Sequence, residues 1–485
     1  MLTPIALGVR SNPERDNDDG AARLVNCYVE AAGEEGLAAY PVYACDGFTA
    51  FSTLTGSGAG VTRGMFNLDD TSLFVVTGTR LNSVNSSGTA TDLGALATTG
   101  YAYFARNRKA PNAQVGLVTS DGLFRIIENG TVSTPTLDSD IGSELFNSIC
   151  ALDGYFIITK SDGEWYITSI DEGTTIDELD FSAASSDADG LLRGLIRGRD
   201  LVLFGPRSVE FWNNTGDASF AFQRAGTTRI GCYAAPAACE VVAVVGGQST
   251  DTIIWPATST TGEYIGVMVL EGYQGQKISP PALDRAIRDE PTLSSIRAFT
   301  YSNGVHAFYC ITGSSFTWEF NLRNGFWHER TSSGLSRWRV VDACGFAGKT
   351  ILADYNAATL YQRSHSISPG ASSSITLRHS KDGGRTFTTG RSKSIGASGE
   401  WDTRVRFNRL GQSKEDGFVI ELAISNAVME AGTGNPMTIL PPPIHAAPSR
   451  IRAHALHVNT VSGTSGTTGP KGIKSLAIDI DKLAP

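Results

Sequence analysis

Residues 161–231 contain the pattern that decides the fold. From Ser161 the chain reads S-D-G-E-W-Y-I-T-S-I-D, and from Asp180 it reads D-F-S-A-A-S-S-D-A-D-G. Two further segments read L-V-L-F-G-P-R-S-V-E-F-W from Leu201 and F-A-F-Q-R-A-G-T-T-R-I-G from Phe220. Each contains a short run of apolar and aromatic residues bounded by turn-forming residues. This composition predicts short β-strands joined by tight turns.

The same alternation of strand-like runs and turns continues along most of the chain, and helical periodicity is nearly absent. Asp-Gly or Asn-Gly pairs, several of which separate two strand-like runs, begin at Asp121, Asn129, Asp153, Asp162, Asn303, Asn324 and Asp382. Both residues of such a pair tolerate a positive φ, which makes the pair a strong hairpin signal. The chain is therefore expected to be all-β.

A longer period is visible in the strands that follow a turn. These strands are centred near Leu81, Phe124, Tyr166, Trp212, Val267, Trp318 and Tyr361, at steps of 43, 42, 46, 55, 51 and 43 residues. Steps of this size built from hairpins indicate β-propeller blades. Six or seven blades are expected, since the first and last hairpins can complete one blade together. The open alternative is an array of β-sandwich modules with coincidental spacing.

Composition divides the chain into three regions. A Gly-Ser segment from Thr55 to Gly60 resembles a linker, so residues 1–59 are predicted to form an N-terminal platform segment. Residues 60–365 are predicted to form the propeller. A Ser-rich stretch from Ser364 to Ser374 precedes a predicted C-terminal β region, residues 366–485, which forms the platform together with the N-terminal segment.

Charge and cysteines exclude several classes of protein. The net charge of -9 argues against tight wrapping of nucleic acid, although a mildly acidic conduit would let DNA slide past. The seven cysteines are scattered, with no C-x-x-C pair, and most of them are predicted to be buried thiols of a protein that folds in the cytoplasm. The N-terminus has no basic leader, and the chain has no apolar run long enough for a bilayer, so no signal peptide or membrane anchor is expected.

No catalytic, cofactor-binding or metal-binding residues are predicted, and the chain is not expected to be an enzyme. The segment S-K-D-G-G-R-T-F, Ser380 to Phe387, fits the Asp-box of sialidase-like propellers, which is a structural hairpin rather than an active site. The segment A-C-G-F-A-G-K-T, Ala343 to Thr350, resembles a P-loop but lacks its first glycine and precedes a hairpin-like pattern. The histidines are scattered, and His454 and His457 would lie on opposite faces of a strand.

The segment from residue 161 to 231 resembles the packaged-DNA stabilisation proteins, or tail hub (nozzle) proteins, of short-tailed bacteriophages. The points of resemblance are Trp165 and Tyr166, Asp180 to Ala183, Asp189 and Gly190, Leu203 to Gly205, Ser208 to Trp212, and Phe220 to Gly231. The segment A-R-L-V-N-C-Y-V-E, Ala22 to Glu30, is similar to a V-N-x-Y-x-E strand near the start of many such proteins. A P-G pair usually follows that strand, and here Asp46 takes the place of the proline.

A second resemblance lies in G-E-W-D-T-R-V-R-F-N-R-L-G, Gly399 to Gly411, which is similar to a C-terminal pattern of phage tail proteins. Strand alternation places Arg404 and Arg406 on one face. Together with Arg409 they are candidates for contact with a neighbouring subunit or with DNA phosphates. The open alternative is a solvated strand face paired with nearby acids.

The resemblance implies a structural virion protein of the phage tail, assembled in the host cytoplasm as a ring of six copies below the portal and its adaptor. Such a hub closes the channel after packaging and conducts the genome at ejection. Its expected partners are itself, the portal-adaptor protein, transient genomic DNA and, left open, a tail fibre, spike or needle. The alternatives are a propeller glycosidase or depolymerase and a receptor-binding module in which Trp255 or Trp327 would stack on sugars, although core packing is the favoured role of both.

Overall fold

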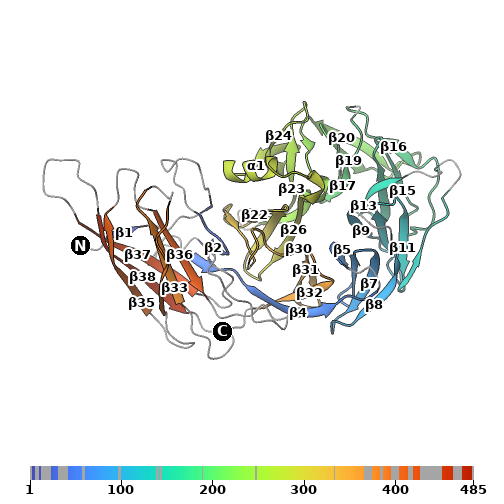
Figure 1. Ribbon diagram of the computed structural model, residues 1–485. Helices are drawn as coiled ribbons and strands as arrows, with labels where there is room; N and C mark the ends of the chain where they lie inside the picture. Colours follow the sequence, from blue (N-terminus) through green and yellow to red (C-terminus); the bar gives the residue numbers. More distant parts are fainter. Residues whose placement is uncertain are drawn as a thin grey trace.

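The computed structural model describes residues 3–5, 10–11, 23–30, 42–56, 60–96, 100–137, 141, 145–187, 189–245, 248–332, 334–364, 374–382, 386–394, 403–412, 419–425, 451–461 and 472–482. These residues fold almost entirely into antiparallel β-sheets (Figure 1). Among them, no α-helix has the length and apolar character needed to span a membrane.

Seven sheets built from the described residues form the blades of a propeller. Blades 1 to 3 consist of β5 (Thr62–Asn67), β6 (Ser72–Thr77), β7 (Arg80–Asn85) and β8 (Ala90–Ala95); β9 (Ala102–Arg106), β10 (Val115–Thr119), β11 (Phe124–Glu128) and β12 (Thr131–Ser133); and β13 (Phe146–Leu152), β14 (Tyr155–Lys160), β15 (Glu164–Ile167) and β16 (Phe181–Ala183).

Blades 4 to 6 follow in chain order. They consist of β17 (Arg193–Arg197), β18 (Asp200–Phe204), β19 (Val209–Asn214) and β20 (Phe222–Thr228); β21 (Gly231–Cys232), β22 (Cys239–Val245), β23 (Gln248–Thr258), β24 (Tyr264–Glu271) and β25 (Gln274–Lys277); and β26 (Arg297–Ser302), β27 (Ala307–Thr312), β28 (Thr317–Asn321) and β29 (Trp327–Glu329). In blade 5, β21 and β22 pair with successive parts of the long strand β23.

Blade 7 combines the two ends of the propeller sequence. It consists of β30 (Val340–Phe346), β31 (Lys349–Asp354), β32 (Thr359–Ser364) and, as its outer strand, β4 (Gly47–Thr53). Strand β4 pairs antiparallel with β32 and places Thr49 opposite Gln362. Strand β4 lies within residues 1–59, the predicted N-terminal platform segment. That segment therefore supplies one strand of the propeller. Without it, β32 would be an open sheet edge.

The blades close into a ring. Each innermost strand contacts the innermost strand of the next blade, in the order β5, β9, β13, β17, β22, β26, β30 and back to β5 (Figure 1). This arrangement confirms the predicted propeller with seven blades and rules out an open array of sandwiches. The seven positions of the predicted period all fall in the third strand of a blade: Leu81 in β7, Phe124 in β11, Tyr166 in β15, Trp212 in β19, Val267 in β24, Trp318 in β28 and Tyr361 in β32.

Aromatic side chains fill the spaces between neighbouring blades. Trp165 of blade 3 lies edge-on to Trp212 of blade 4, with ring centroids 5.1 Å apart. Phe204 of blade 4 packs in the same manner on Trp255 of blade 5, at 5.5 Å. Trp255 and Trp327 are both buried, which confirms their predicted place in the core and removes them as sugar-stacking surfaces.

The turns and one of the two long steps of the period also have a structural explanation. Both residues of Asn129-Gly130 and of Asp153-Gly154 have a positive φ, as the hairpin prediction requires. The 51-residue step between blades 5 and 6 contains the short helix α1 (Pro281–Arg288). Its residues Leu283 and Ile287 join the core between these blades. Short 3-10 turns, η2 (Ala235–Ala237) and η3 (Leu293–Ser295), flank the same region.

The strands outside the propeller form two further sheets. In the first, β2 (Cys27–Val29), β3 (Val42–Ala44), β37 (Ile451–Val461), β38 (Gly472–Lys482) and β35 (Thr403–Gln412) pair in that order, and β1 (Thr3–Ile5) also pairs with β37. The second contains β34 (Arg391–Ser394), β33 (Ser374–Ser380) and β36 (Val419–Ser425). N-terminal and C-terminal segments thus share one sheet beside the propeller (Figure 1). Most of the predicted Ser-rich linker, residues 365–373, lies outside the described residues.

Phe48 tests the closure of blade 7. Its ring is buried in β4 and lies 4.7 Å from the ring of Tyr361 in β32. Phe48→Ala is expected to lower the free energy of unfolding by about 3–5 kcal/mol, because the vacated space cannot collapse fully. The measurement is urea-induced unfolding followed by intrinsic fluorescence.

The matched control is Phe181→Ala in β16, the outer strand of blade 3, where the side chain is 42% exposed. This substitution should cost about 1 kcal/mol or less. Equal losses of unfolding free energy in the two variants would contradict the role of the β4–β32 pair in closing the propeller.

Candidate functional site: a polar junction between the N-terminal segment and blade 6

Residues 23–30 lie along the outer edge of blade 6. The amide of Asn26 donates to the carbonyl of Glu329, and the amide of Glu329 donates to the carbonyl of Leu24, both at 2.8 Å. Asn26 has a φ of 55°, and its side-chain amide exchanges two hydrogen bonds of 3.0 Å with the backbone of Thr331. The segment therefore satisfies an edge that would otherwise be open.

Two further side chains of this segment reach into blade 6. The ring of Tyr28 packs against His306, Phe308 and His328. Glu30 Oε1 lies 2.7 Å from His306 Nε2, and this hydrogen bond lowers the pKa of Glu30 below its ordinary value. The junction thus combines backbone pairing, aromatic packing and a charge-assisted hydrogen bond.

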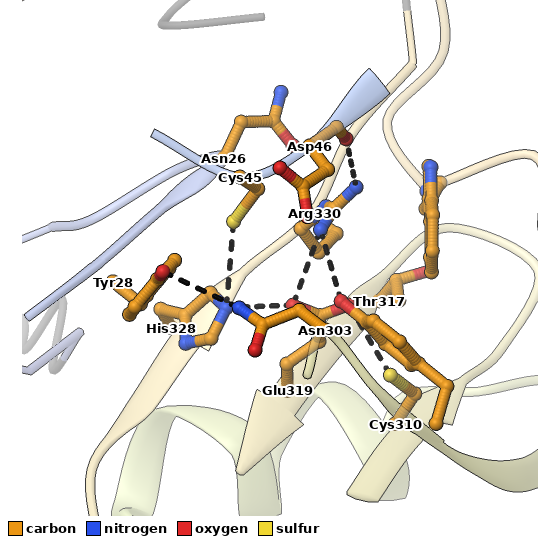
Figure 2. A network of polar contacts seen from close by, with 12 residues as sticks. Asn26, Tyr28, Cys45, Asp46, Asn303, Cys310, Thr317, Glu319, His328 and Arg330 are labelled. Carbon is orange, nitrogen blue, oxygen red and sulfur yellow. Dashed lines mark hydrogen bonds and ion pairs between the residues drawn. The ribbon is translucent and has the colours of Figure 1, made fainter. Parts of the chain in front are cut away.

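Glu319 lies at the centre of the junction, on β28, with no exposed surface. Its Oε1 accepts hydrogen bonds from Tyr301 Oη at 3.0 Å and Cys310 Sγ at 3.2 Å. Its Oε2 lies 2.6 Å from His328 Nε2 and 3.4 Å from Arg330 Nη1 (Figure 2). Burial would raise the pKa of Glu319, but the charge of Arg330 and the hydrogen bond from His328 outweigh it and lower the pKa to about 2. The carboxylate is therefore ionised in the protein interior.

Arg330 supplies the positive charge that this buried carboxylate needs. Its guanidinium lies over the ring of Trp338, 4.0 Å from the centroid, and Nη1 donates to Tyr301 Oη at 3.2 Å. Residues two apart on an extended strand face the same side, so His328 and Arg330 both reach Glu319. Glu329, between them, faces the other way and pairs with Arg23 at 2.7 Å.

Cys45 completes a set of three buried groups that could hold a metal ion, together with Glu319 and His328, whose ligand atoms all lie within 4.8 Å of one another. The geometry does not fit a metal centre. His328 Nε2 already bonds Glu319 at 2.6 Å, Arg330 lies beside the same oxygen, and burial raises the pKa of the Cys45 thiol well above its ordinary value. Metal ligation needs a thiolate. The arrangement therefore fits a hydrogen-bond network that stabilises an ionised carboxylate.

All seven cysteines are free thiols, and five of them are buried, which confirms that most are buried thiols. The junction itself was not predicted. The signal in the sequence is W-H-E-R, Trp327 to Arg330, in which three consecutive polar residues interrupt an apolar strand. His306 and His328 seemed isolated, yet His306 contacts Glu30 of the distant N-terminal segment, and His328 contacts Glu319 on the neighbouring strand.

The candidate arginines lie elsewhere, on β35, at the opposite edge of the shared sheet from β2. Val405 and Phe407 are buried and Arg406 is exposed, so the predicted alternation holds at these positions. Arg404 stands opposite Asp479 of β38 in the register. Arg409 lies on the same strand.

The two other motifs are structural. Asp382 accepts hydrogen bonds of 2.6 Å from the hydroxyls of Ser380 and Thr386, which shapes the connection between β33 and β34 as an Asp-box hairpin would. Residues 383–385 of the box lie outside the described residues. The near-miss P-loop is the hairpin of β30 and β31, with a positive φ at Ala347 and Gly348, and so offers no helix N-terminus for a phosphate.

Glu319→Gln tests the junction. It leaves the buried Arg330 without a charge partner and is expected to lower the free energy of unfolding by about 3–5 kcal/mol at pH 7. Because the pKa of Glu319 is lowered in the folded state, the stability it supplies is present above about pH 4.5 and lost as the pH falls towards 2. When the free energy of unfolding is measured from pH 6 to pH 2.5, the variant should lack the loss of stability that protonation of Glu319 causes in the wild type.

The matched control is Glu128→Gln, which removes a carboxylate from a half-exposed pair with Lys109. It should change stability little at any pH, because solvent screens such pairs. If Glu319→Gln behaves like this control, the junction does not depend on the buried charge.

Comparisons with solved structures return matches of low sequence identity. They include the WD40 β-propeller domain of Doa1 (12% identity, 65% of this chain and 96% of that chain, TM-score 0.38) and the computationally designed Ika8 protein (8%, 65% and 99%, 0.38). A streptogramin B lyase also matches (9%, 65% and 96%, 0.44). A comparison with curated proteins found no match. The family model described as "Bacteriophage P22 Gp10, beta-propeller" matches residues 1–368, and the chain therefore belongs to this family of phage stabilisation proteins.

Proposed function

We propose that the chain is the tail hub, or nozzle, subunit of a short-tailed phage. In this proposal, six copies form a ring below the portal and its adaptor, close the channel after the genome is packaged, and conduct the DNA at ejection. The protein assembles in the host cytoplasm and resides in the tail of the virion. Its partners are other copies of itself, the adaptor, genomic DNA in transit and a distal fibre, spike or needle.

The observation that carries the proposal is the extent of the family match. The match runs from residue 1 to 368 and so includes the N-terminal segment, the polar junction and all seven blades. The unit shared with the phage family is therefore the propeller with its N-terminal segment attached. A rigid disc of this kind suits a mechanical role, in which subunits set the spacing around an axis and bring no chemistry of their own.

The sheet outside the propeller that joins N-terminal and C-terminal strands suits contacts between subunits. A ring requires two different patches on each subunit, which meet by rotation. The propeller can supply one patch, and the sheet shared by β1–β3, β35, β37 and β38 can supply the other. The net charge of -9 agrees with a conduit to which DNA does not adhere.

We assign Arg404, Arg406 and Arg409 to this second patch. Arg406 is exposed between two buried neighbours on β35, so its charge is available to an adjacent subunit or to passing DNA. A positive strand on an acidic protein is complementary to the rest of its own surface, which favours the subunit contact over DNA.

Ring formation is the first test. Negative-stain imaging and mass photometry of the purified protein should show closed rings of six, and particles that lack the protein should lose packaged DNA. A protein that stays monomeric at all concentrations, with particles that retain their genome without it, would contradict the proposal. Turnover of a fluorogenic sialoside or of host polysaccharide would instead favour the glycosidase alternative.

Charge reversal tests the arginine assignment. Arg406→Glu is expected to raise the concentration for half-assembly about ten-fold or more, equivalent to about 1.4 kcal/mol, because a like charge then faces the acidic neighbour. Arg108→Glu, at an exposed position on the propeller, is the matched control and should leave assembly unchanged. Equal assembly of both variants would remove Arg406 from the interface.

A further inference from the structure

The centre of the propeller contains a cavity of about 610 Å³, lined by the innermost strands. This volume lies in the range of small-molecule pockets, about 300–1000 Å³. The cavity lies inside the ring of blades of one chain and is therefore separate from any genome channel between the subunits of a ring.

Three arginines from three blades line this cavity: Arg63 near the start of β5, Arg193 at the start of β17 and Arg297 at the start of β26. The guanidinium of Arg63 is engaged by the protein, since Nη1 donates to the carbonyl of Gly78 at 3.1 Å and Nη2 donates to Ser120 Oγ at 3.2 Å. Arg297 Nη1 donates to the carbonyl of Thr62 at 2.8 Å, and Arg63 Nε donates to the carbonyl of Gly100 at 2.7 Å. Starts of innermost strands from separate blades are thus brought together.

Tyrosines of blade 2 hold two of these guanidiniums. Arg193 lies over the ring of Tyr103 at 4.6 Å, and Arg297 lies over the ring of Tyr101 at 4.5 Å. Within the described part of the chain, each of the two arginines donates one hydrogen bond, Arg193 to the carbonyl of Ala235, and neither forms an ion pair. A guanidinium has five N–H donors in a planar fork, so several donors of each remain for a ligand.

The acids in the cavity wall are engaged by the backbone. Glu240 Oε1 accepts from the amide of Ile196 at 2.7 Å. Asp342 accepts from the amides of Met65 at 3.0 Å and Ala343 at 2.8 Å. Burial raises the pKa of Glu240, and it raises the pKa of Asp342 to about 6. Among the described residues, neither carboxylate forms an ion pair with Arg193 or Arg297, although the charges of both arginines oppose the rise in the pKa of Asp342.

Arg63 and Arg297 also repel each other. Burial lowers the pKa of Arg63, and the charge of Arg297 lowers it further, although Asp121 opposes the effect. Gathering positive charge in a confined space costs free energy, and an anion placed between the arginines would relieve that cost.

We propose that this cavity binds a small ligand that carries a phosphate group. Planar guanidinium forks match the paired oxygens of a phosphate, and the two forks of Arg193 and Arg297 favour a multiply charged group over a single carboxylate. Apolar residues of the wall, including Phe104, Phe299 and Ile149, leave room for an organic part beside the anion. The site is independent of the ring proposal, because it lies within one chain.

Calorimetric titration with sodium pyrophosphate tests the site, with sodium chloride at equal ionic strength as the reference and citrate as the carboxylate arm. The wild-type protein should bind pyrophosphate, and more tightly than citrate. Arg193→Gln and Arg297→Gln should each weaken binding about ten-fold or more. The matched control is Arg199→Gln, an exposed arginine in the turn after β17, which should bind like the wild type.

Circular dichroism and thermal unfolding establish that each variant is folded. Arg193→Lys and Arg297→Lys keep the positive charge but lose the planar guanidinium, and they should bind pyrophosphate with intermediate affinity. If a glutamine variant fails to fold, these lysine variants test whether the guanidinium binds the ligand. Tighter binding of citrate than of pyrophosphate would contradict a phosphate ligand and indicate a carboxylate ligand. Absence of pyrophosphate binding by the wild type, or equal affinity of the cavity variants and Arg199→Gln, would overturn the proposal.

Discussion

The pairing of β4 with β32 is the interaction on which the rest of the structure depends. Each blade has two apolar faces, and only a closed ring buries all of them. Phe48, buried in β4, packs on Tyr361 of β32 and joins the N-terminal segment to the last blade. The same segment then runs along blade 6, where Asn26 and Tyr28 make specific contacts. One stretch of chain therefore covers the outer edges of two adjacent blades.

The polar junction gives a physical reason for the V-N-x-Y-x-E pattern. Val25 bridges to Glu329, Asn26 bonds Thr331, Tyr28 packs on the histidines, and Glu30 pairs with His306. Every named position of the pattern thus contacts blade 6. The hydrogen bonds of Asn26 with Thr331 and of Glu30 with His306 are directional, and they fix one alignment of the segment where apolar packing alone would allow several.

Much of the fold could be predicted because hairpin turns and strand composition are local. The turn at Asp153 is recognised from two adjacent residues, and one apolar or aromatic third strand recurs in each blade, so the period emerged without any long-range information. The junction and the cavity could not be predicted, since they depend on contacts between distant residues. Nothing near Cys45 in the chain indicates Glu319, and nothing near Tyr101 indicates Arg297. The available signal for both sites was a polar residue inside an apolar strand. Such a residue marks the position of a site but does not show which distant residues contact it.

Closure of blade 7 also has a consequence for synthesis on the ribosome. Thr49 and Gln362, which face each other across the β4–β32 pair, are 313 residues apart in the chain. At translation rates of about 5–20 residues per second, β4 waits roughly 15–60 s for its partner to be made. During that delay a nascent chain carries an unpaired strand, and on a crowded polysome the nearest free β32 can belong to another copy. Exchange of β4 between copies is therefore the characteristic misassembly to expect of this topology.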